Sequence, residues 1–195
     1  VRLPVMVNYD GFIISHTADA LRMLPDDVAY KFIGEYKAAY ALLDVENPIT
    51  VGPLDLTDYY FEHKASQLAA YPKALEIIKK VSDEFGALTG RYYDHCEEYM
   101  MDDAEMVMVM LGSSAGTAKD VIDEYREKGV KVGLLKIRTF RPFPFEYISK
   151  VLADRKAVCV LDRSASFGGQ GGPVFMELRH AMYGQQVPIF SYIYG

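Results

Sequence analysis

The strongest constraint on the fold is an alternation of apolar runs and helical patterns in the second half of the chain. Four apolar runs predict four strands, at residues 104–111, 130–137, 157–161 and 187–193. Between these runs, apolar side chains recur at the spacing of a helix. Strands that alternate with helices need crossover connections, which give a mostly parallel sheet with helices on both faces. The sequence therefore predicts a three-layer α/β domain over residues 102–195.

The first half of the chain is less regular. Residues 3–7 have the apolar pattern of a buried strand that ends at the turn Asp10-Gly11-Phe12. One strand cannot bury both of its faces alone. Because Val1 is also not an initiator methionine, we expect the chain to begin at the last strand of an upstream α/β domain.

A long connector is predicted between the two halves. Residues 31–57 are expected to form a loop, and Asp58 is expected to begin a long helix that Pro72 kinks or divides. The predicted division is residues 1–30 as the remnant of the upstream domain, 31–101 as the connector, and 102–195 as the α/β domain.

The composition excludes several classes of protein. The 195 residues are 50% hydrophobic and 25% charged, which is typical of a globular protein. No apolar run is long enough to cross a membrane and no signal-peptide layout is present, so a cytoplasmic location is expected. Residues 1–101 carry 9 basic and 16 acidic side chains, and residues 102–195 carry 12 and 11. Neither half has the basic balance of a nucleic-acid binder.

The two cysteines are too few for an iron–sulfur cluster or a cysteine-rich zinc site. Cys159 lies in an apolar run and is predicted to be a core residue. Cys96 lies among charged side chains at residues 94–98, which favours a solvated helix face. A metal site at Cys96 would need further convergent ligands, so no metal is expected in this chain.

Two glycine-containing loops follow predicted strands at their carboxyl ends, where open α/β sheets bind ligands. Each precedes a helix, whose free N–H groups favour an anion or a close inter-domain contact; ordinary turn chemistry and a flexible loop are the alternatives. The candidate residues are Gly112, Ser113, Ser114, Gly116 and Thr117 in the first loop and Gly168, Gly169, Gly171 and Gly172 in the second. Thr117 with Asp120 resembles a helix capping box.

Two further groups could take part in binding or chemistry. Lys136, Arg138 and Arg141 concentrate positive charge, and we expect them to pair with acidic residues of the first half rather than to hold an anionic cofactor. His16 follows Ser15 closely after the Asp10 turn. Because the sequence shows no partner that would make His16 a catalytic base, a structural or interface role is favoured.

Several stretches are distinctive as a set. The first is Asn8-Tyr9-Asp10-Gly11-Phe12-Ile13-Ile14-Ser15-His16. The second runs from Met110 to Pro144 and includes Leu111-Gly112-Ser113 and Arg138-Thr139-Phe140-Arg141-Pro142. The third is Val160-Leu161-Asp162-Arg163, which the second glycine loop follows. Together they resemble the alpha subunit of 2-oxoacid:ferredoxin oxidoreductases of the pyruvate synthase type. The Arg-x-x-Arg-Pro pattern is also similar to the transketolase-type C-terminal domain of pyruvate dehydrogenase beta subunits.

The resemblance implies a coenzyme A-dependent oxidative decarboxylation of pyruvate or a related 2-oxoacid. Thiamine diphosphate with magnesium and iron–sulfur clusters would be bound mainly outside this chain, and the isolated chain would be inactive. The implied partners are beta, gamma and delta type subunits, ferredoxin, the 2-oxoacid and coenzyme A. Residues 102–195 would form a transketolase C-terminal-like domain that supports the cofactor-binding domains.

No complete catalytic set is expected in the chain. The candidates for the edge nearest the cofactor are Asp10, Gly11, Ser15 and His16. Two other functions stay open from the residues alone, namely a stand-alone nucleotide- or coenzyme A-binding module that uses the two glycine loops, and a purely structural interaction domain.

Overall fold

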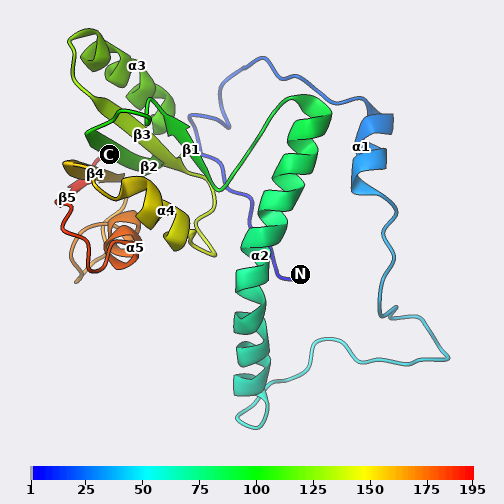
Figure 1. Ribbon diagram of the computed structural model, residues 1–195. Helices are drawn as coiled ribbons and strands as arrows, with labels where there is room; N and C mark the ends of the chain where they lie inside the picture. Colours follow the sequence, from blue (N-terminus) through cyan, green and yellow to red (C-terminus); the bar gives the residue numbers. More distant parts are fainter. Residues whose placement is uncertain (1) are drawn as a thin grey trace. The chain divides into compact units, whose positions relative to one another are not determined.

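The computed structural model describes residues 2–195, which divide into two units (Figure 1). The first unit comprises the residues up to Thr17 together with residues 72–195, and the second comprises residues 18–71. All five strands of the described residues lie in the first unit.

The sheet has the strand order β1-β3-β2-β4-β5. Its strands are β1 (Cys96–Tyr99), β2 (Met106–Leu111), β3 (Val132–Ile137), β4 (Ala157–Asp162) and β5 (Ile189–Ile193). The pairs β2–β3, β2–β4 and β4–β5 are parallel, whereas β1 pairs antiparallel with β3 at one edge. The predicted mostly parallel α/β sheet is confirmed.

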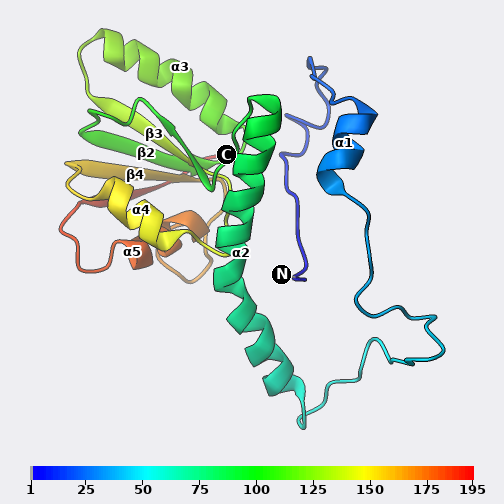
Figure 2. The ribbon, with the colours of Figure 1, turned by 45° about the vertical axis from the view of Figure 1, so that its right-hand side comes forward.

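Helices cover both faces of the sheet, as Figure 2 shows. The helix α3 (Ser114–Glu127) lies on one face, and α4 (Phe145–Leu152) and α5 (Pro173–Ala181) lie on the other. Alternate residues of a strand point to opposite faces, so the sheet contributes to two clusters of buried side chains, one on each face. The three-layer architecture predicted from the sequence is confirmed.

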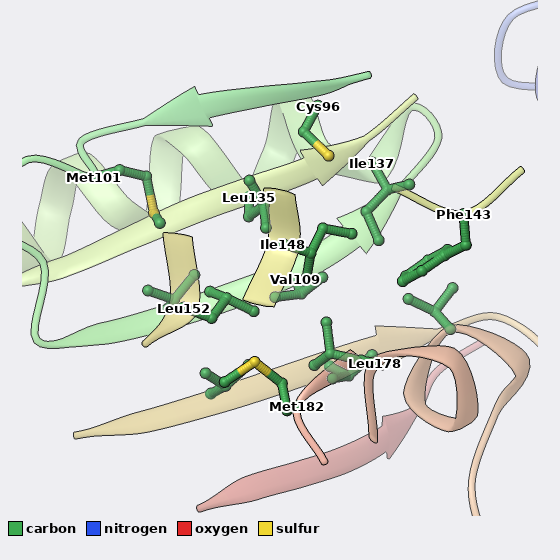
Figure 3. Close-up of a cluster of buried hydrophobic side chains, with 14 of the residues drawn as sticks. Cys96, Met101, Val109, Leu135, Ile137, Phe143, Ile148, Leu152, Leu178 and Met182 are labelled. Carbon is green, nitrogen blue, oxygen red and sulfur yellow. The ribbon is translucent and has the colours of Figure 1, made fainter. Parts of the chain in front are cut away.

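The larger cluster lies between the sheet and the helices α4 and α5 (Figure 3). Val109 and Leu135 of the sheet pack there with Ile148, Leu152 and Leu178, and all five side chains are completely buried. Burying one such side chain stabilises the fold by about 1.5–3 kcal/mol. The smaller cluster joins α3 to the sheet and contains Met110, Ala115, Ala118, Ile122 and Leu134.

The start of α3 differs from the prediction. The helix begins at Ser114, three residues before Thr117, and no side-chain hydrogen bond caps it. Gly112 has a φ of +81°, a left-handed conformation that suits glycine and turns the chain sharply after β2. The predicted capping box is therefore wrong, because the turn at Gly112 leads directly into the helix.

Residues 94–99 correct a second prediction. They form β1 and the residues before it rather than a solvated helix face. Glu97 and Tyr99 hydrogen-bond to side chains of α3, namely Lys119 and Asp123, while Glu98 accepts a hydrogen bond from Tyr147 of α4. Cys96 is buried in the larger cluster (Figure 3). The charged pattern misled because both helical layers supply polar partners to this edge strand.

The first residues also differ from the prediction. Residues 3–7 form no strand, and Val5, Met6 and Val7 are exposed. A strand is stabilised by pairing with a neighbour, and none of the strands in residues 2–195 pairs with this segment.

The helix α2 (Tyr60–Thr89) is continuous through Pro72, so the predicted division of this helix is wrong, whereas a kink at Pro72 stays a prediction. Ala, Leu, Lys and Glu are frequent on both sides of Pro72, and their high helix propensity favours a continuous helix. A short helix, α1 (Asp26–Ile33), was not expected from the sequence. The domain boundaries at residues 30 and 101 stay a prediction.

Candidate functional site

The candidate site lies where the carboxyl ends of β2, β3 and β4 meet at one edge of the sheet. Parallel strands bring together the loops that follow them, and such edges are where open α/β sheets bind ligands. The loop after β2 contains Gly112 and Ser113, and the loop after β4 runs from Arg163 to Gly172.

Asp10 is held at this edge by the loop after β2. The backbone N–H of Ser113 donates a hydrogen bond to Asp10 Oδ2. The loop leaves little space for more than a glycine beside this carboxylate, since a Cβ on Gly112 would lie 3.1 Å from Asp10 Oδ2 and 3.2 Å from Oδ1. The contact joins residues that lie 103 positions apart in the sequence.

The surroundings of Asp10 favour its charged form. Hydrogen bonds from the side chain and backbone of Ser113 lower the pKa of Asp10, and the positive charges of Arg163 and Lys136 lower it further. Burial acts in the opposite direction and does not outweigh them. Asp10 is therefore an ionised anchor at neutral pH.

The turn after Asp10 orders Ser15 and His16. Phe12 N–H donates to Ser15 Oγ at 2.8 Å, and Ser15 Oγ lies 2.7 Å from Nδ1 of His16. The rings of Phe12 and His16 stack with centroids 5.1 Å apart. Phe12 has a φ of +66°, an uncommon conformation for a bulky residue, whereas a Cβ on the preceding Gly11 would contact nothing within 4 Å. These contacts hold the imidazole in one orientation, with Nδ1 engaged by Ser15.

Asp162, at the end of β4, also accepts hydrogen bonds from backbone N–H groups. This buried side chain accepts hydrogen bonds from the N–H groups of Val174 and Phe175 in the first turn of α5, at 3.0 and 3.1 Å. A Cβ on Gly172 would lie 2.3 Å from Asp162, so glycine is needed for this close approach. Asp162 thus satisfies N–H groups that a helix N-terminus would otherwise offer to an anion.

The other glycines of the second loop have different surroundings. Gly171 has a φ of +85°, and a Cβ there would lie 2.5 Å from the Phe175 ring and 2.8 Å from Ser191 Oγ. Gly168 has open space around it, whereas Gly169 packs near Ser166. In the first loop, Ser114, Gly116 and Thr117 lie within the first turns of α3.

These two loops do not fit a diphosphate group. In the first loop, the N–H group of Ser113 already donates to the Asp10 carboxylate. After the second loop, the N–H groups of Val174 and Phe175 at the start of α5 already donate to the Asp162 carboxylate. A phosphate placed there would have to displace a carboxylate and would meet its like charge.

The cations near the candidate site are mostly paired. Arg138 and Lys119 both form ion pairs with Glu97 of β1. Burial would raise the pKa of Glu97, but the Lys119 hydrogen bond and the charges of Arg138, Lys119 and Lys136 outweigh it and lower this pKa. The predicted pairing with the first half of the chain is confirmed for Arg138, but it is wrong for Arg141, which pairs with Glu177 of α5 at 2.5 Å.

Among residues 2–195, no group of three or more His, Cys, Asp or Glu side chains is arranged to hold a metal ion. Burial raises the pKa of the Cys96 thiol to about 12, with the charges of Asp94 and Glu98 acting in the same direction. Cys96 is therefore a protonated core residue, which argues against the alternative of a metal ligand at this position.

Comparisons with known proteins agree with this arrangement. The family model described as Pyruvate flavodoxin/ferredoxin oxidoreductase, thiamine diP-bdg matches residues 1–83, and the one described as Pyruvate:ferredoxin oxidoreductase core domain II matches residues 104–195. The pyruvate synthase subunit PorA of Thermotoga maritima is 49% identical over the whole of this chain. This chain belongs to the alpha-subunit family of 2-oxoacid:ferredoxin oxidoreductases.

Other members of the family are also similar over the whole of this chain. The pyruvate synthase subunit PorA of Methanosarcina barkeri and the ketoisovalerate oxidoreductase subunit VorA of Pyrococcus abyssi are each 39% identical to it. The chain spans about half the length of these curated relatives, 49–50% of each.

A solved structure of a 2-oxoglutarate:ferredoxin oxidoreductase from Magnetococcus marinus matches 80% of this chain and 25% of its own chain, with a TM-score of 0.50 and 16% identity. This likeness supports the fold alone.

Two residues of the candidate site were missed by the sequence analysis, Asp162 and Glu97. Asp162 could have been found, because it ends an apolar strand and precedes a glycine-rich loop and a helix. Glu97 gave no such signal, since its partners Lys119 and Arg138 come from distant parts of the sequence.

Within residues 2–195, no helix combines the length and the apolar character that a membrane-spanning segment needs.

Proposed function

We propose that this chain contributes a positioning module to a thiamine-diphosphate-dependent 2-oxoacid:ferredoxin oxidoreductase that works with further subunits. The proposed reaction cleaves the bond between the carboxyl and carbonyl carbons of a 2-oxoacid and releases carbon dioxide. The acyl group passes to coenzyme A, and two electrons pass to ferredoxin. Pyruvate or a related 2-oxoacid is the proposed substrate, on the basis of the names of the relatives.

The observation that carries this proposal is the contact between Asp10 and Ser113. It joins a residue within the match of the thiamine-type family model to a residue within the match of core domain II. The family domain at residues 104–195 would thereby fix the turn that carries Ser15 and His16. Enzymes that hold a cofactor between domains tolerate little misplacement, so a rigid anchor of this kind serves catalysis.

The proposed cofactors are thiamine diphosphate with magnesium, and iron–sulfur clusters for electron transfer, held by other parts of the enzyme. Carboxylates of the chain itself already accept the N–H group of Ser113 in the first loop and those at the start of α5 after the second loop, so neither is the proposed diphosphate site. The same observation argues against a stand-alone nucleotide- or coenzyme A-binding module, which would use these loops. We propose Asp10, Gly11, Ser15 and His16 as the edge of this chain nearest the cofactor.

A pair of glycine variants tests the proposal in the assembled enzyme. Gly112 and Gly129 both have a φ of +81°, so Gly112→Ala and Gly129→Ala impose a similar backbone strain of about 1–2 kcal/mol. Only the methyl group at position 112 would meet a neighbour, the Asp10 carboxylate, because a Cβ at Gly129 has nothing within 4 Å. We expect Gly112→Ala to lower kcat for 2-oxoacid-dependent ferredoxin reduction by roughly tenfold or more, since small misplacements have large kinetic effects.

The control variant Gly129→Ala should retain most of the turnover of the unmodified enzyme. Thermal unfolding of both variants checks that they remain folded to a similar extent. Equal turnover in the two variants would show that the anchor at Asp10 does not position catalytic groups.

A further inference from the structure

The second unit, residues 18–71, is rich in apolar side chains that no other part of residues 2–195 buries. Thirty of its 54 residues are of hydrophobic type, a share slightly above the 50% of the whole chain. None of its residues is buried. Sixteen of its large apolar or aromatic side chains are more than half exposed, among them Tyr36, Leu43 and Leu54. Proteins rarely leave so much apolar surface in contact with water.

The segment is neither a self-contained domain nor a simple linker. Its regular structure consists of the eight-residue α1 and the first part of α2, and residues 34–59 form neither helix nor strand (Figure 1). Irregular stretches of this length are uncommon unless they bind something or are disordered. Disordered linkers are poor in aromatic residues, whereas this segment has eight Tyr and Phe residues. Its composition is that of a surface that other protein residues cover.

The charge of the segment indicates what kind of surface covers it. Residues 18–71 carry nine acidic and four basic side chains, so they hold a net charge of −5 out of −6 for the whole chain. If a second copy of the chain covered the segment with its own residues 18–71, two acidic segments would meet and repel each other. A partner with Lys and Arg around an apolar patch would match both the apolar side chains and the charge.

We propose that residues 18–71 form an arm that lies along the surface of a different subunit, one that offers an apolar patch rimmed by basic side chains. This inference rests on the proposed function, which makes the chain part of a multi-subunit enzyme. Exposed tyrosines of the arm, such as Tyr36, would insert into that patch as anchors, because aromatic side chains dominate the binding energy of interfaces.

Hydrogen–deuterium exchange on the complete enzyme and on the isolated subunit tests the location of the arm. We expect slow exchange at residues 18–71 in the complete enzyme and fast exchange in the isolated subunit. Slow exchange in the isolated subunit would overturn the proposal, because the arm would then be covered by its own chain if the subunit is monomeric, or by a second copy if it is dimeric.

A matched pair of variants tests the arm as the source of binding energy. Tyr36 and Tyr183 are equally exposed, at 89% and 91%, but Tyr183 lies outside the arm. We expect Tyr36→Ser to weaken binding of the alpha-type subunit to its partner subunits at least tenfold, as measured by titration of separately purified subunits. Tyr183→Ser should bind as the unmodified subunit does, and equal effects of the two variants would contradict the proposal.

The salt dependence of the same titration tests the charge of the partner. Binding that weakens as ionic strength rises supports a basic rim, whereas binding that does not change contradicts it.

Ferredoxin reduction measured on the same preparation separates this inference from the proposed function. If the unmodified complete enzyme reduces ferredoxin with a 2-oxoacid and Tyr36→Ser still assembles normally, the arm proposal fails and the proposed function stands. If the complete enzyme shows no such activity while the arm is protected only in the complex, the proposed function fails and the arm as an interface stands.

Discussion

The α/β unit at residues 104–195 and the arm at residues 18–71 have similar shares of apolar residues but opposite environments. In the α/β unit, apolar residues recur with the periods of strands and helices, so each element presents one apolar side to its neighbours. In the arm they recur without a sustained period, and none is buried. The comparison teaches that periodic placement, more than the amount of apolar side chain, lets a segment build its own core.

A pair of leucine variants has the largest expected effect on the free energy of unfolding. Equal effects of the two variants would contradict this comparison. Leu135 in β3 is 0% exposed and Leu43 in the arm is 90% exposed. Leu135→Ala should lower the free energy of unfolding by about 2–5 kcal/mol, because it removes packed methyl groups and leaves a cavity. Leu43→Ala should change it by less than about 0.5 kcal/mol.

Chemical denaturation followed by far-UV circular dichroism measures both leucine variants. A large destabilisation by Leu43→Ala in the isolated chain would show that the arm has a core of its own.

Substitution of two aspartates, each of which accepts two backbone N–H groups, has a smaller expected effect on stability. Asp162 does so in a buried position at the start of α5, whereas Asp44 does so in an exposed turn with Glu46 and Asn47. Asp162→Ala should destabilise the chain by about 1–3 kcal/mol, since water cannot replace the lost acceptor.

Asp44→Ala is the matched control, and it should leave the unfolding transition unchanged because water reaches the freed N–H groups. Thermal unfolding of both variants checks this prediction. Equal shifts of the melting temperature would mean that burial does not distinguish the two carboxylates.

The titration of Asp10 has the smallest expected effect on stability. The pKa of Asp10 is lowered in the folded chain, first by the hydrogen bonds from Ser113 and then by the charges of Arg163 and Lys136. A carboxyl group with a depressed folded pKa stabilises the fold above its unfolded pKa, near 3.8, and loses this contribution as the pH falls through the lowered value. We expect the amide chemical shift of Ser113 to titrate in that acidic range.

The variant Asp10→Asn should abolish this titration. High salt should reduce the lowering of the Asp10 pKa, since two of its causes are the charges of Arg163 and Lys136. Asp44 also has a lowered pKa, caused first by hydrogen bonds from Asn47, but its partners lie within three residues of it. Acidification should therefore loosen a long-range contact at Asp10 and only a local turn at Asp44. If the Ser113 amide shift does not respond to pH, Asp10 does not contact this loop in solution.

The sequence was most informative where local pattern and tertiary structure agree. A helix was expected between the apolar runs at residues 130–137 and 157–161, and α4 (Phe145–Leu152) lies there. The parallel strands were found within two residues of their observed starts, because buried strands are apolar along their whole length. The resemblance on Asp10, Gly112 and Arg138 led to the family that the comparisons show.

The tertiary structure alone decided the identity of β1 and the contacts of the two glycine loops. An edge strand with two glutamates has no distinctive pattern, and the ion pairs and hydrogen bonds of Glu97 and Glu98 depend on helices that follow later in the chain. The carboxylates of Asp10 and Asp162 fill loops that resemble anion sites in the sequence. Sequence determines which groups can bind an anion, but whether the chain's own carboxylates reach them first depends on contacts between residues as far as 103 positions apart.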